Sequence, residues 1–497
     1  MSLTLWLLGA ISVLELLVWL PPLWPLRKPL IVVIVPVLSL SSGLLFGWDV
    51  SIWTGLILIF SIYRIVNLLR VLDARMQPKR LYKSTMLTAW WLISAQLIVL
   101  GGSRIHIEDM TLLYVAALSQ LVVAFLLWLS TGHNLRLAKP STNPKSLSDK
   151  ELPTLSIAIP SRNETRDLEE CLRSLVTSNY PKFEVLVLDD CSQNKRTPGI
   201  IRDFAQSGVR FIAGKTPPEH WLAKNYAYAQ LAEEANGELL LFCGVDTRFK
   251  PDSLRSMVEA MLQRHRTMIS FIPRNNPPRS LNLESLFVQP ARYAWELSLP
   301  RNLFNRPPVL STCWMITAKE LKRVGGFEAV SRSISPESYF ARSSARSKDG
   351  YNFMRSDQAM DLSSAKSLAE QRATAVRTRY PQLHRRPELV ALSGIGELAV
   401  LAWPFVLLVT AISSNDWLLT VPAAIACLFL ISFYARVVRL TYHRFLWRGL
   451  WTLPLVAIYD IGLLNYSMWQ YEFRQVVWKG RNVCIPVMRH AGSEKTP

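Results

Sequence analysis

Long apolar runs near both ends of the chain constrain its fold more than any other feature. A run of about 18 or more apolar residues is long enough to cross a bilayer as a helix. The runs before residue 135 span roughly 3–20, 29–48, 52–69, 84–102 and 110–131. Two more span 390–412 and 417–435, and Arg448 and Asp460 interrupt a further stretch, 445–471, for which we predict a re-entrant or interfacial hairpin. We therefore expect a polytopic membrane protein with seven crossings.

Basic residues in alternate short loops predict how the helices are oriented, because Lys and Arg collect on the cytoplasmic side. Arg27 and Lys28 follow the first run, and further bases lie between the third and fourth runs, at Arg70, Arg75, Lys79, Arg80 and Lys83. The other loops are poor in bases. We expect an inner-membrane or cell-membrane protein with its N-terminus outside and the segment after residue 132 in the cytoplasm.

Two charged residues lie inside apolar runs, Arg64 and Asp460. An isolated charge at the centre of a membrane helix costs about 2.5 to 3.5 kcal/mol on insertion scales. Either these side chains have a function within the membrane, or they lie near an interface and extend into the headgroup region.

The composition excludes several classes of protein. Half of the residues are hydrophobic and 19% are charged, which argues against a purely soluble enzyme. The 56 Lys and Arg exceed the 37 Asp and Glu, giving +19, but they are spread along the chain. We expect an anionic membrane surface and no nucleic acid as partner. The six Cys form no CxxC pair, so we expect buried thiols and neither a disulfide scaffold nor a zinc site.

The middle of the chain has shorter apolar runs and reads as a soluble α/β domain. Short buried strands are predicted at 155–159, 184–188, 209–213 and 238–243, and helices between them at 167–175, 200–206 and 223–235. This alternation indicates a parallel sheet covered by helices on both faces. The expected divisions are a transmembrane domain (1–132), a linker (133–152), an α/β domain (153–389), a second transmembrane domain (390–471) and a basic cytoplasmic tail (472–497).

Polar residues follow three of the four predicted strands. They are Ser161 to Glu164, Asp189 with Asp190, and Asp246. Ligands of parallel sheets bind at the carboxyl ends of the strands, so these residues are expected to meet on one rim. Crowded carboxylates need a cation, and their hard oxygens suit Mg²⁺ or Mn²⁺ bridging to phosphates. Neither a GxGxxG nor a GxxxxGK[ST] motif is present.

Five motifs in order resemble the membrane-bound family 2 glycosyltransferases, which are inverting enzymes with the GT-A (Rossmann-like) fold. They are Ile159-Pro160-Ser161-Arg162-Asn163-Glu164, Val187-Leu188-Asp189-Asp190-Cys191-Ser192, Trp221-Leu222-Ala223-Lys224, Gly244-Val245-Asp246-Thr247 and Gly325-Gly326-Phe327. The group that includes hopanoid, carotenoid and ceramide lipid glycosyltransferases is the most similar. The resemblance covers about 153–386, together with the tail Trp478-Lys479-Gly480-Arg481, and implies a GT-A domain inserted between two sets of transmembrane helices.

The resemblance implies roles for several residues in donor binding. Asp189 and Asp190, with Glu164 beside them, are expected to hold the base and ribose of a nucleotide, and the alternative is that one Asp caps the following turn. Lys224, at a helix N-terminus, is expected to meet the diphosphate, since an anion offsets its unfavourable position on the helix dipole. Trp221 either flanks the donor or simply packs.

Asp246 matches the last acid of the family's DxD metal motif. It is expected to hold Mg²⁺ or Mn²⁺ against the donor diphosphate. Gly244 replaces the first acid of the motif, which leaves one carboxylate for the metal.

An inverting transfer needs a carboxylate that takes the proton from the acceptor hydroxyl. The family keeps this base in a Glu-Asp pair soon after Gly-Gly-Phe. Glu337 is the candidate here and Asp349 is the reserve, while first-turn helix charge after Pro336 is the alternative for Glu337.

The segment 331–389 holds 11 Lys or Arg and 6 acids, and 11 minus 6 gives +5. We expect most of these bases to face anionic headgroups, with a few, such as Arg372 or Arg377, at the diphosphate. The QxxRW motif of processive relatives is replaced by Gln371-Arg372-Ala373-Thr374-Ala375. That difference favours the addition of a single sugar.

These features predict a non-processive inverting glycosyltransferase that moves a sugar from a UDP- or GDP-sugar to a hydroxyl of a lipid-like acceptor at the cytoplasmic membrane face. The alternatives are a processive polysaccharide synthase, a degenerate nucleotide-sugar-binding scaffold and, less consistent with the absence of internal repeats, a transporter.

Overall fold

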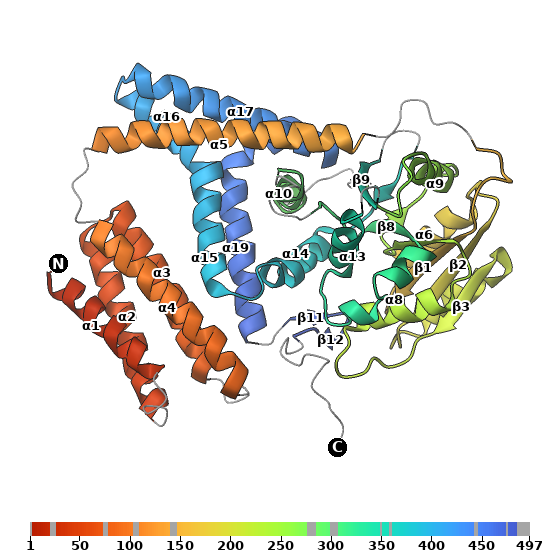
Figure 1. Ribbon diagram of the computed structural model, residues 1–497, viewed down its shortest axis with the longest axis horizontal. Coiled ribbons are helices and arrows are strands. Elements are labelled where there is room, and N and C mark those ends of the chain that lie inside the picture. Colours follow the sequence, from red (N-terminus) through yellow and green to blue (C-terminus); the bar gives the residue numbers. More distant parts are fainter. Residues whose placement is uncertain are drawn as a thin grey trace.

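The computed structural model describes residues 2–19, 26–72, 78–102, 109–139, 147–275, 285–298, 307–347, 350–356, 360–441, 446–473 and 476–484. An α/β domain lies at one end and a group of long apolar helices at the other (Figure 1). Asp349 lies outside the described residues, and so do most of the residues of the expected basic tail.

A seven-stranded sheet in the order β3-β2-β1-β4-β8-β6-β9 forms the centre of the α/β domain. Its strands are β1 (Leu155–Ser161), β2 (Phe183–Asp189), β3 (Val209–Ala213), β4 (Leu239–Cys243), β6 (Met268–Ile272), β8 (Cys313–Thr317) and β9 (Tyr351–Arg355). The four strands expected from the sequence are confirmed, and they are parallel. The sheet also contains strands that were not predicted from the sequence, and one of them, β8, runs antiparallel between β4 and β6.

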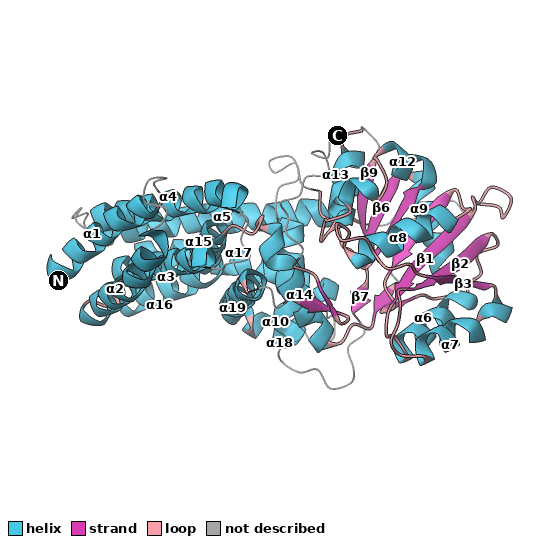
Figure 2. Ribbon diagram, turned by 90° about the horizontal axis from the view of Figure 1, so that it is seen from below, coloured by secondary structure: helices cyan, strands magenta, loops and turns pink. Residues whose placement is uncertain are grey.

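Alternate residues of the strands pack against helices on opposite faces of the sheet, as the pleat requires. One core contains Ile157, Val187 and Leu241 and lies under α6 (Arg166–Val176), α7 (Arg196–Asp203) and α9 (Ser253–Gln263). The other contains Leu188, Phe242 and Trp314 and lies under α8 (Ala223–Glu234), α12 (Ala318–Arg323) and α13 (Pro336–Ala345). Figure 2 shows α6 and α7 on one side of the sheet and α12 and α13 on the other.

Smaller elements connect the sheet to its surroundings. A three-stranded sheet joins β5 (Thr247–Arg248), β10 (Ser363–Ser364) and β7 (Arg274–Asn275). Helices α10 (Ser285–Ser298) and α14 (Leu368–Gln382) lie between the α/β domain and the apolar helices (Figure 1). A capping box formed by Ser367 and Glu370 fixes the start of α14.

The apolar helices form two groups. They are α1 (Ser2–Val18), α2 (Arg27–Trp48), α3 (Ile52–Leu72), α4 (Pro78–Gly102), α5 (Asp109–Leu137), α15 (Pro387–Glu397), α16 (Trp403–Ser413), α17 (Trp417–Thr441), α18 (Leu446–Trp451) and α19 (Leu453–Glu472). Helices α1 to α4 share one core, whereas α5 packs against α17. Helices α15 and α19 lie side by side (Figure 1).

Five helical stretches of the described chain are long and apolar enough to cross a membrane: 27–48, 52–72, 113–137, 387–413 and 417–440. Two apolar helices are shorter, 6–18 and 88–100. These findings suggest a multi-pass membrane protein, and the number of crossings stays a prediction. The stretch 445–471, expected as a hairpin, contains α18 followed by one continuous 20-residue helix, α19.

Both charges within the apolar runs are buried and form ion pairs. Arg64 is fully buried in the α1 to α4 bundle, where its Nη2 lies 2.7 Å from Glu15 Oε2, so it does not extend to an interface. Asp460 of α19 forms an ion pair with Arg379 of α14. A third pair joins the two groups of helices, since Arg70 of α3 lies 2.6 Å from Glu472 at the end of α19.

Candidate functional site

The strand register brings the loops after β1 and β2 together at the expected rim. Ser161 pairs with Asp189 across the two strands, and the backbone N–H of Asp190 donates to Ser161 O at 2.8 Å. Each loop then turns through a residue with positive φ, Asn163 at 53° and Cys191 at 52°. Such backbone conformations are uncommon for residues other than glycine and cluster at functional sites.

The three acids predicted to hold the nucleoside have different surroundings on this rim. Asp189 accepts a 3.3 Å hydrogen bond from the Ser192 N–H, which matches the turn-capping alternative. Asp190 is 4% exposed, and both of its carboxylate oxygens lie 2.7 Å from Arg481 Nη1. Burial raises the pKa of Asp190, and the Arg481 charge opposes that rise.

Glu164 lies on the loop after β1, and its Oε1 is 2.6 Å from Lys479 Nζ. Burial raises the pKa of Glu164, while the lysine lowers it. Asp190 and Glu164 therefore both face cations from the far end of the chain, which the sequence did not indicate.

Asp246 follows β4 and is held by the segment that continues from β10. Its Oδ2 accepts a 2.9 Å hydrogen bond from Ser364 Oγ, and its backbone oxygen accepts from the Ala365 N–H at 2.8 Å. A Cβ at position 244 would lie 2.4 Å from Asp246 Oδ1. The Asp246 carboxylate therefore occupies space that a side chain at position 244 would fill.

Lys224 occupies the first turn of α8, and its Nζ lies 5.4 Å from the ring centroid of Tyr228. Burial lowers the pKa of Lys224, and the charges of Glu337 and Asp246 oppose that effect. The neighbouring Trp221 packs edge-on against Tyr226 at 5.4 Å, as its structural interpretation predicts.

Glu337 lies in the first turn of α13, directly after Pro336, and is 3% exposed. Its Oε2 has no hydrogen-bond partner among the described residues. Burial raises the pKa of Glu337, and the Lys224 charge is the strongest opposing influence. A buried, unpartnered oxygen is unusual for a carboxylate whose only role is to offset a helix dipole. Of the two base candidates, only Glu337 can be located, because Asp349 lies outside the described residues.

Two more cations near the site, Lys366 and Arg377, belong to the basic segment 331–389, most of which was expected to face headgroups. Lys366 and Arg377 are half-buried and interact electrostatically with Asp246 and Glu337 respectively. Burial lowers the pKa of Lys366 to about 8 and that of Arg377 to about 10. The headgroup-facing interpretation is therefore wrong for Lys366, and Arg377 lies at the site as one of the two suggested arginines. The other, Arg372, is exposed.

Arg292 of α10 also interacts electrostatically with Lys224, Lys366 and Glu337. With Lys224, Lys366 and Arg377, it makes four cations around the carboxylates of Glu337 and Asp246. We call these six residues the charge cluster. Its excess of positive charge suits an anion such as a diphosphate.

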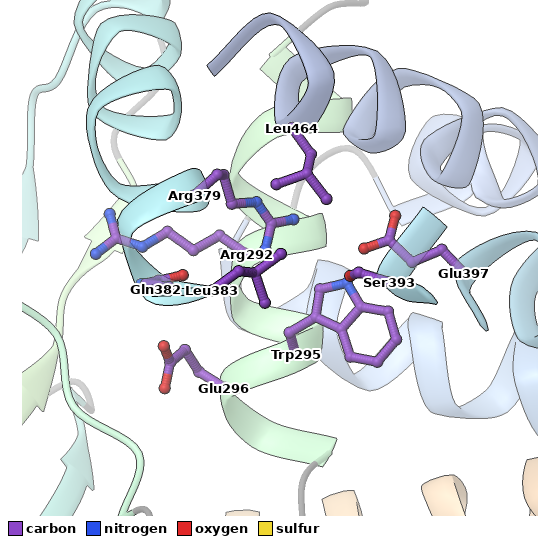
Figure 3. Close-up of a pocket in the computed structure, with 9 residues that line it drawn as sticks. All are labelled: Arg292, Trp295, Glu296, Arg379, Gln382, Leu383, Ser393, Glu397 and Leu464. Atoms are coloured by element: carbon purple, nitrogen blue, oxygen red, sulfur yellow. The ribbon is translucent and has the colours of Figure 1, made fainter. Parts of the chain in front are cut away.

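A pocket of about 150 Å³ adjoins the charge cluster through Arg292. Its lining comes from α10, α14, α15 and α19 and consists of Arg292, Trp295, Glu296, Arg379, Gln382, Leu383, Ser393, Glu397 and Leu464 (Figure 3). The Trp295 side chain hydrogen-bonds to Glu397. The pocket thus combines polar groups with an indole and leucines where the α/β domain meets the apolar helices.

Asp246 fits a divalent cation only as one of several ligands. Among the described residues, no group of three or more His, Cys, Asp or Glu side chains could hold a metal ion. Mg²⁺ commonly binds through one or two carboxylates together with substrate phosphates and waters. The donor set therefore suits a cation that arrives with a diphosphate, rather than one held by the protein alone.

The parallel strands β1, β2 and β4 have acids after their carboxyl ends and a basic cluster beside them, which is the arrangement expected of a GT-A α/β domain. Residues 156–323 match the family described as glycosyl transferase family 2. Residues 156–323 therefore resemble a family 2 glycosyltransferase domain, and apolar helices lie before and after them.

Known proteins resemble parts of the chain. The probable glycosyltransferase YdaM of Bacillus subtilis is 30% identical over 109 residues, which are 21% of this chain and 25% of the relative. Glycosyltransferase AglE of Haloferax volcanii is 31% identical over 99 residues, 19% of this chain and 31% of the relative. The matches thus span about a quarter to a third of these relatives. The mannosyltransferase PcManGT of Pyrobaculum calidifontis, solved with GDP-Man and Mn²⁺, is 16% identical, with a TM-score of 0.43 over 72% of this chain and 99% of that one.

Proposed function

We propose that the protein transfers one sugar, with inversion, from a nucleotide-sugar donor to a hydroxyl of a lipid-like acceptor at the cytoplasmic face of the membrane. One observation carries the proposal. The buried, unpartnered Oε2 of Glu337 lies in the same cluster as Asp246 and four cations. A base for the acceptor and positive charge for a leaving diphosphate are the two components that such a transfer requires.

In the proposed reaction, the acceptor hydroxyl donates its proton to Glu337 as its oxygen attacks the anomeric carbon. The bond from that carbon to the donor phosphate breaks on the opposite face, and the electron pair leaves on the diphosphate. Lys224, Lys366 and Arg377 are positioned to stabilise that charge, and Lys224 does so from a helix N-terminus, where anions are favoured. Asp246 would hold a divalent cation, which supplies further neutralisation of the leaving group when bound.

Asp190 and Glu164 are proposed to hold the ribose and base of the donor. Both lie on loops after parallel strands, where nucleotides bind in such sheets. Neither residue distinguishes uridine from guanosine, so both nucleotides serve as probes below.

The pocket behind Arg292 supports a lipid-like acceptor. It lies between α10 and α14 on one side and the apolar helices α15 and α19 on the other, and its leucines and indole suit a hydrocarbon chain beside a polar head. The sequence of α14, Gln371 to Ala375 without a QxxRW motif, supports transfer of one sugar rather than polymerisation.

The proposal is tested by nucleotide release from the purified protein in detergent with membrane lipid extract. UDP- and GDP-sugars are compared with and without Mn²⁺ or Mg²⁺, and the lipid product is analysed by mass spectrometry. We expect release from one donor, dependence on lipid, and product masses raised by one sugar. Glu337→Gln should lower the rate about a hundredfold or more, since a general base typically contributes that much.

Glu328→Gln is the matched control, because Glu328 is an exposed carboxylate nine positions earlier. It should keep the full rate. Full activity of Glu337→Gln would remove Glu337 as the base, and products with a ladder of sugars would indicate a processive synthase. Nucleotide binding without release from any donor would instead indicate the catalytically degenerate scaffold.

A further inference from the structure

The chain ends its described part with a short hairpin, residues 476–484, which we call the tail hairpin. Strand β11 (Val477–Trp478) pairs antiparallel with β12 (Arg481–Asn482). Lys479 and Gly480 form the turn with φ of 49° and 78°. Two positive φ values in a two-residue loop are typical of the tight hairpin turns that match strand twist.

The tail hairpin lies on the rim proposed to bind the nucleoside. Arg481 Nη1 lies 2.7 Å from both oxygens of Asp190, and Lys479 Nζ lies 2.6 Å from Glu164 Oε1. Arg162 completes the connection, since its Nε donates to Lys479 O at 2.8 Å and its Nη1 donates to Cys191 O at 2.8 Å. Both proposed nucleoside carboxylates are thus fixed by one segment roughly 300 positions further along the chain.

Apolar side chains anchor the tail hairpin to the rest of the molecule. Val476 is 5% and Val483 8% exposed, and both belong to a buried cluster with Leu222, Tyr380 and Tyr471. The Arg377 guanidinium of the charge cluster lies 5.2 Å from the ring centroid of Trp478. A segment held in this way is a fixed wall of the site and differs from a loosely bound plug, which would have little apolar burial.

The cations of the tail hairpin stabilise the ionised forms of Asp190 and Glu164. Burial raises the pKa of both Asp190 and Glu164, and Arg481 and Lys479 are the partners that counteract it. A carboxylate that accepts from one arginine keeps lone pairs for ribose hydroxyls. Removing one member of a buried pair would leave the other as an uncompensated charge.

We propose that the tail hairpin is a permanent part of the nucleotide site, in which Arg481 and Lys479 are positioning residues that orient Asp190 and Glu164 for the nucleoside of the donor. This inference rests on the proposed function, which assigns those acids to the nucleotide.

The test uses the full-length protein in detergent, with UDP and GDP as calorimetric probes and with donor kinetics. Arg481→Met is expected to weaken binding of the preferred nucleotide and raise the donor KM about tenfold, the change that loss of one charged hydrogen bond produces, with little change in kcat. Arg481→Lys should recover much of the affinity. Lys319→Met, which removes an exposed lysine from α12, should bind like the wild type.

Melting temperatures accompany each measurement, and Lys479→Met probes Glu164 independently in case Arg481→Met unfolds. Unchanged binding in both Met variants would overturn the proposal, and so would tighter binding, which would identify the hairpin as a plug. Asp190→Asn distinguishes failure of the positioning role of Arg481 from failure of the assignment of Asp190 to the nucleotide. If it loses affinity while Arg481→Met does not, only this inference fails. If Asp190→Asn and Arg481→Met both bind normally, the assignment of Asp190 to the nucleotide fails with it.

Discussion

Lys366 and Glu337 should limit activity from opposite sides of the pH scale. Glu337 must lose its proton to act as a base, so activity should fall as pH drops through its raised pKa. Lys366 must keep its proton to hold the diphosphate, so the donor KM should rise as pH rises through about 8. The expected profile of kcat/KM is a bell.

The alkaline side of that bell can be assigned with one variant. Lys366→Arg should shift it upward, because a guanidinium keeps its proton at higher pH. Donor KM measured from about pH 6 to about pH 10 checks this, because the range extends to both sides of the Lys366 pKa of about 8. An alkaline limb that is identical in the wild type and in Lys366→Arg would contradict the role of Lys366.

Gly244 offers a second prediction at the scale of single residues. In Gly244→Ala, the added methyl group would overlap the Asp246 carboxylate and separate it from Ser364. We expect donor turnover to fall about tenfold, as for the loss of one hydrogen bond to a charged group. Ser364→Ala should reproduce the loss, and Gly199→Ala, where no atom lies within 4 Å of the new Cβ, should not. An increase in turnover in Gly244→Ala would contradict this account.

The sequence led to some of these residues and not to others for a physical reason. Asp189, Asp190 and Asp246 follow buried strands, and the carboxyl ends of parallel strands must meet. Lys366 and Arg377 instead belong to a segment with many bases, where local pattern does not indicate which side chains turn inward. Their placement depends on β10, which pairs with β5 from more than 100 positions earlier.

Among the strands, the positions and the parallel direction of β1 to β4 were predictable, whereas the direction of β8 was not. A buried run of about five residues marks a strand, as β1 to β4 confirm. The same kind of run forms β8, yet nothing within Cys313–Thr317 encodes that it pairs antiparallel with β4 and β6. Long-range packing decides that choice.

The pocket between α10, α14, α15 and α19 yields a prediction for these elements. Leu383→Trp should fill part of its roughly 150 Å³ and slow transfer to lipid, while UDP or GDP binding stays unchanged. Leu392→Trp is the control, because Leu392 on α15 is 45% exposed and does not line the pocket. Lipid transfer and nucleotide calorimetry are measured on both variants. Equal transfer rates in the two would exclude the pocket as the acceptor site.

For the whole molecule, the cytoplasmic location of the α/β domain stays a prediction that Cys191 can test. This thiol is exposed beside Asp190, contrary to the expectation of buried thiols, whereas Cys171, Cys243, Cys313 and Cys427 are buried. In a Cys484→Ser background, a membrane-impermeant maleimide should label Cys191 in inside-out vesicles and not in right-side-out vesicles.

Cys191→Ser in the same background should abolish the labelling. Labelling of Cys191 in sealed right-side-out vesicles alone would reverse the predicted orientation, and with it the side of the membrane from which the donor is taken.

The tail hairpin imposes an order on biosynthesis. Its strands follow α19, and Arg70 of α3 braces the last turn of that helix through Glu472. The α/β domain is synthesised long before these residues, so its rim at first lacks Arg481 and Lys479. A nascent chain would therefore bind its donor more weakly until α19 is inserted and residue 484 has emerged from the ribosome, which would couple efficient sugar transfer to the insertion of α19.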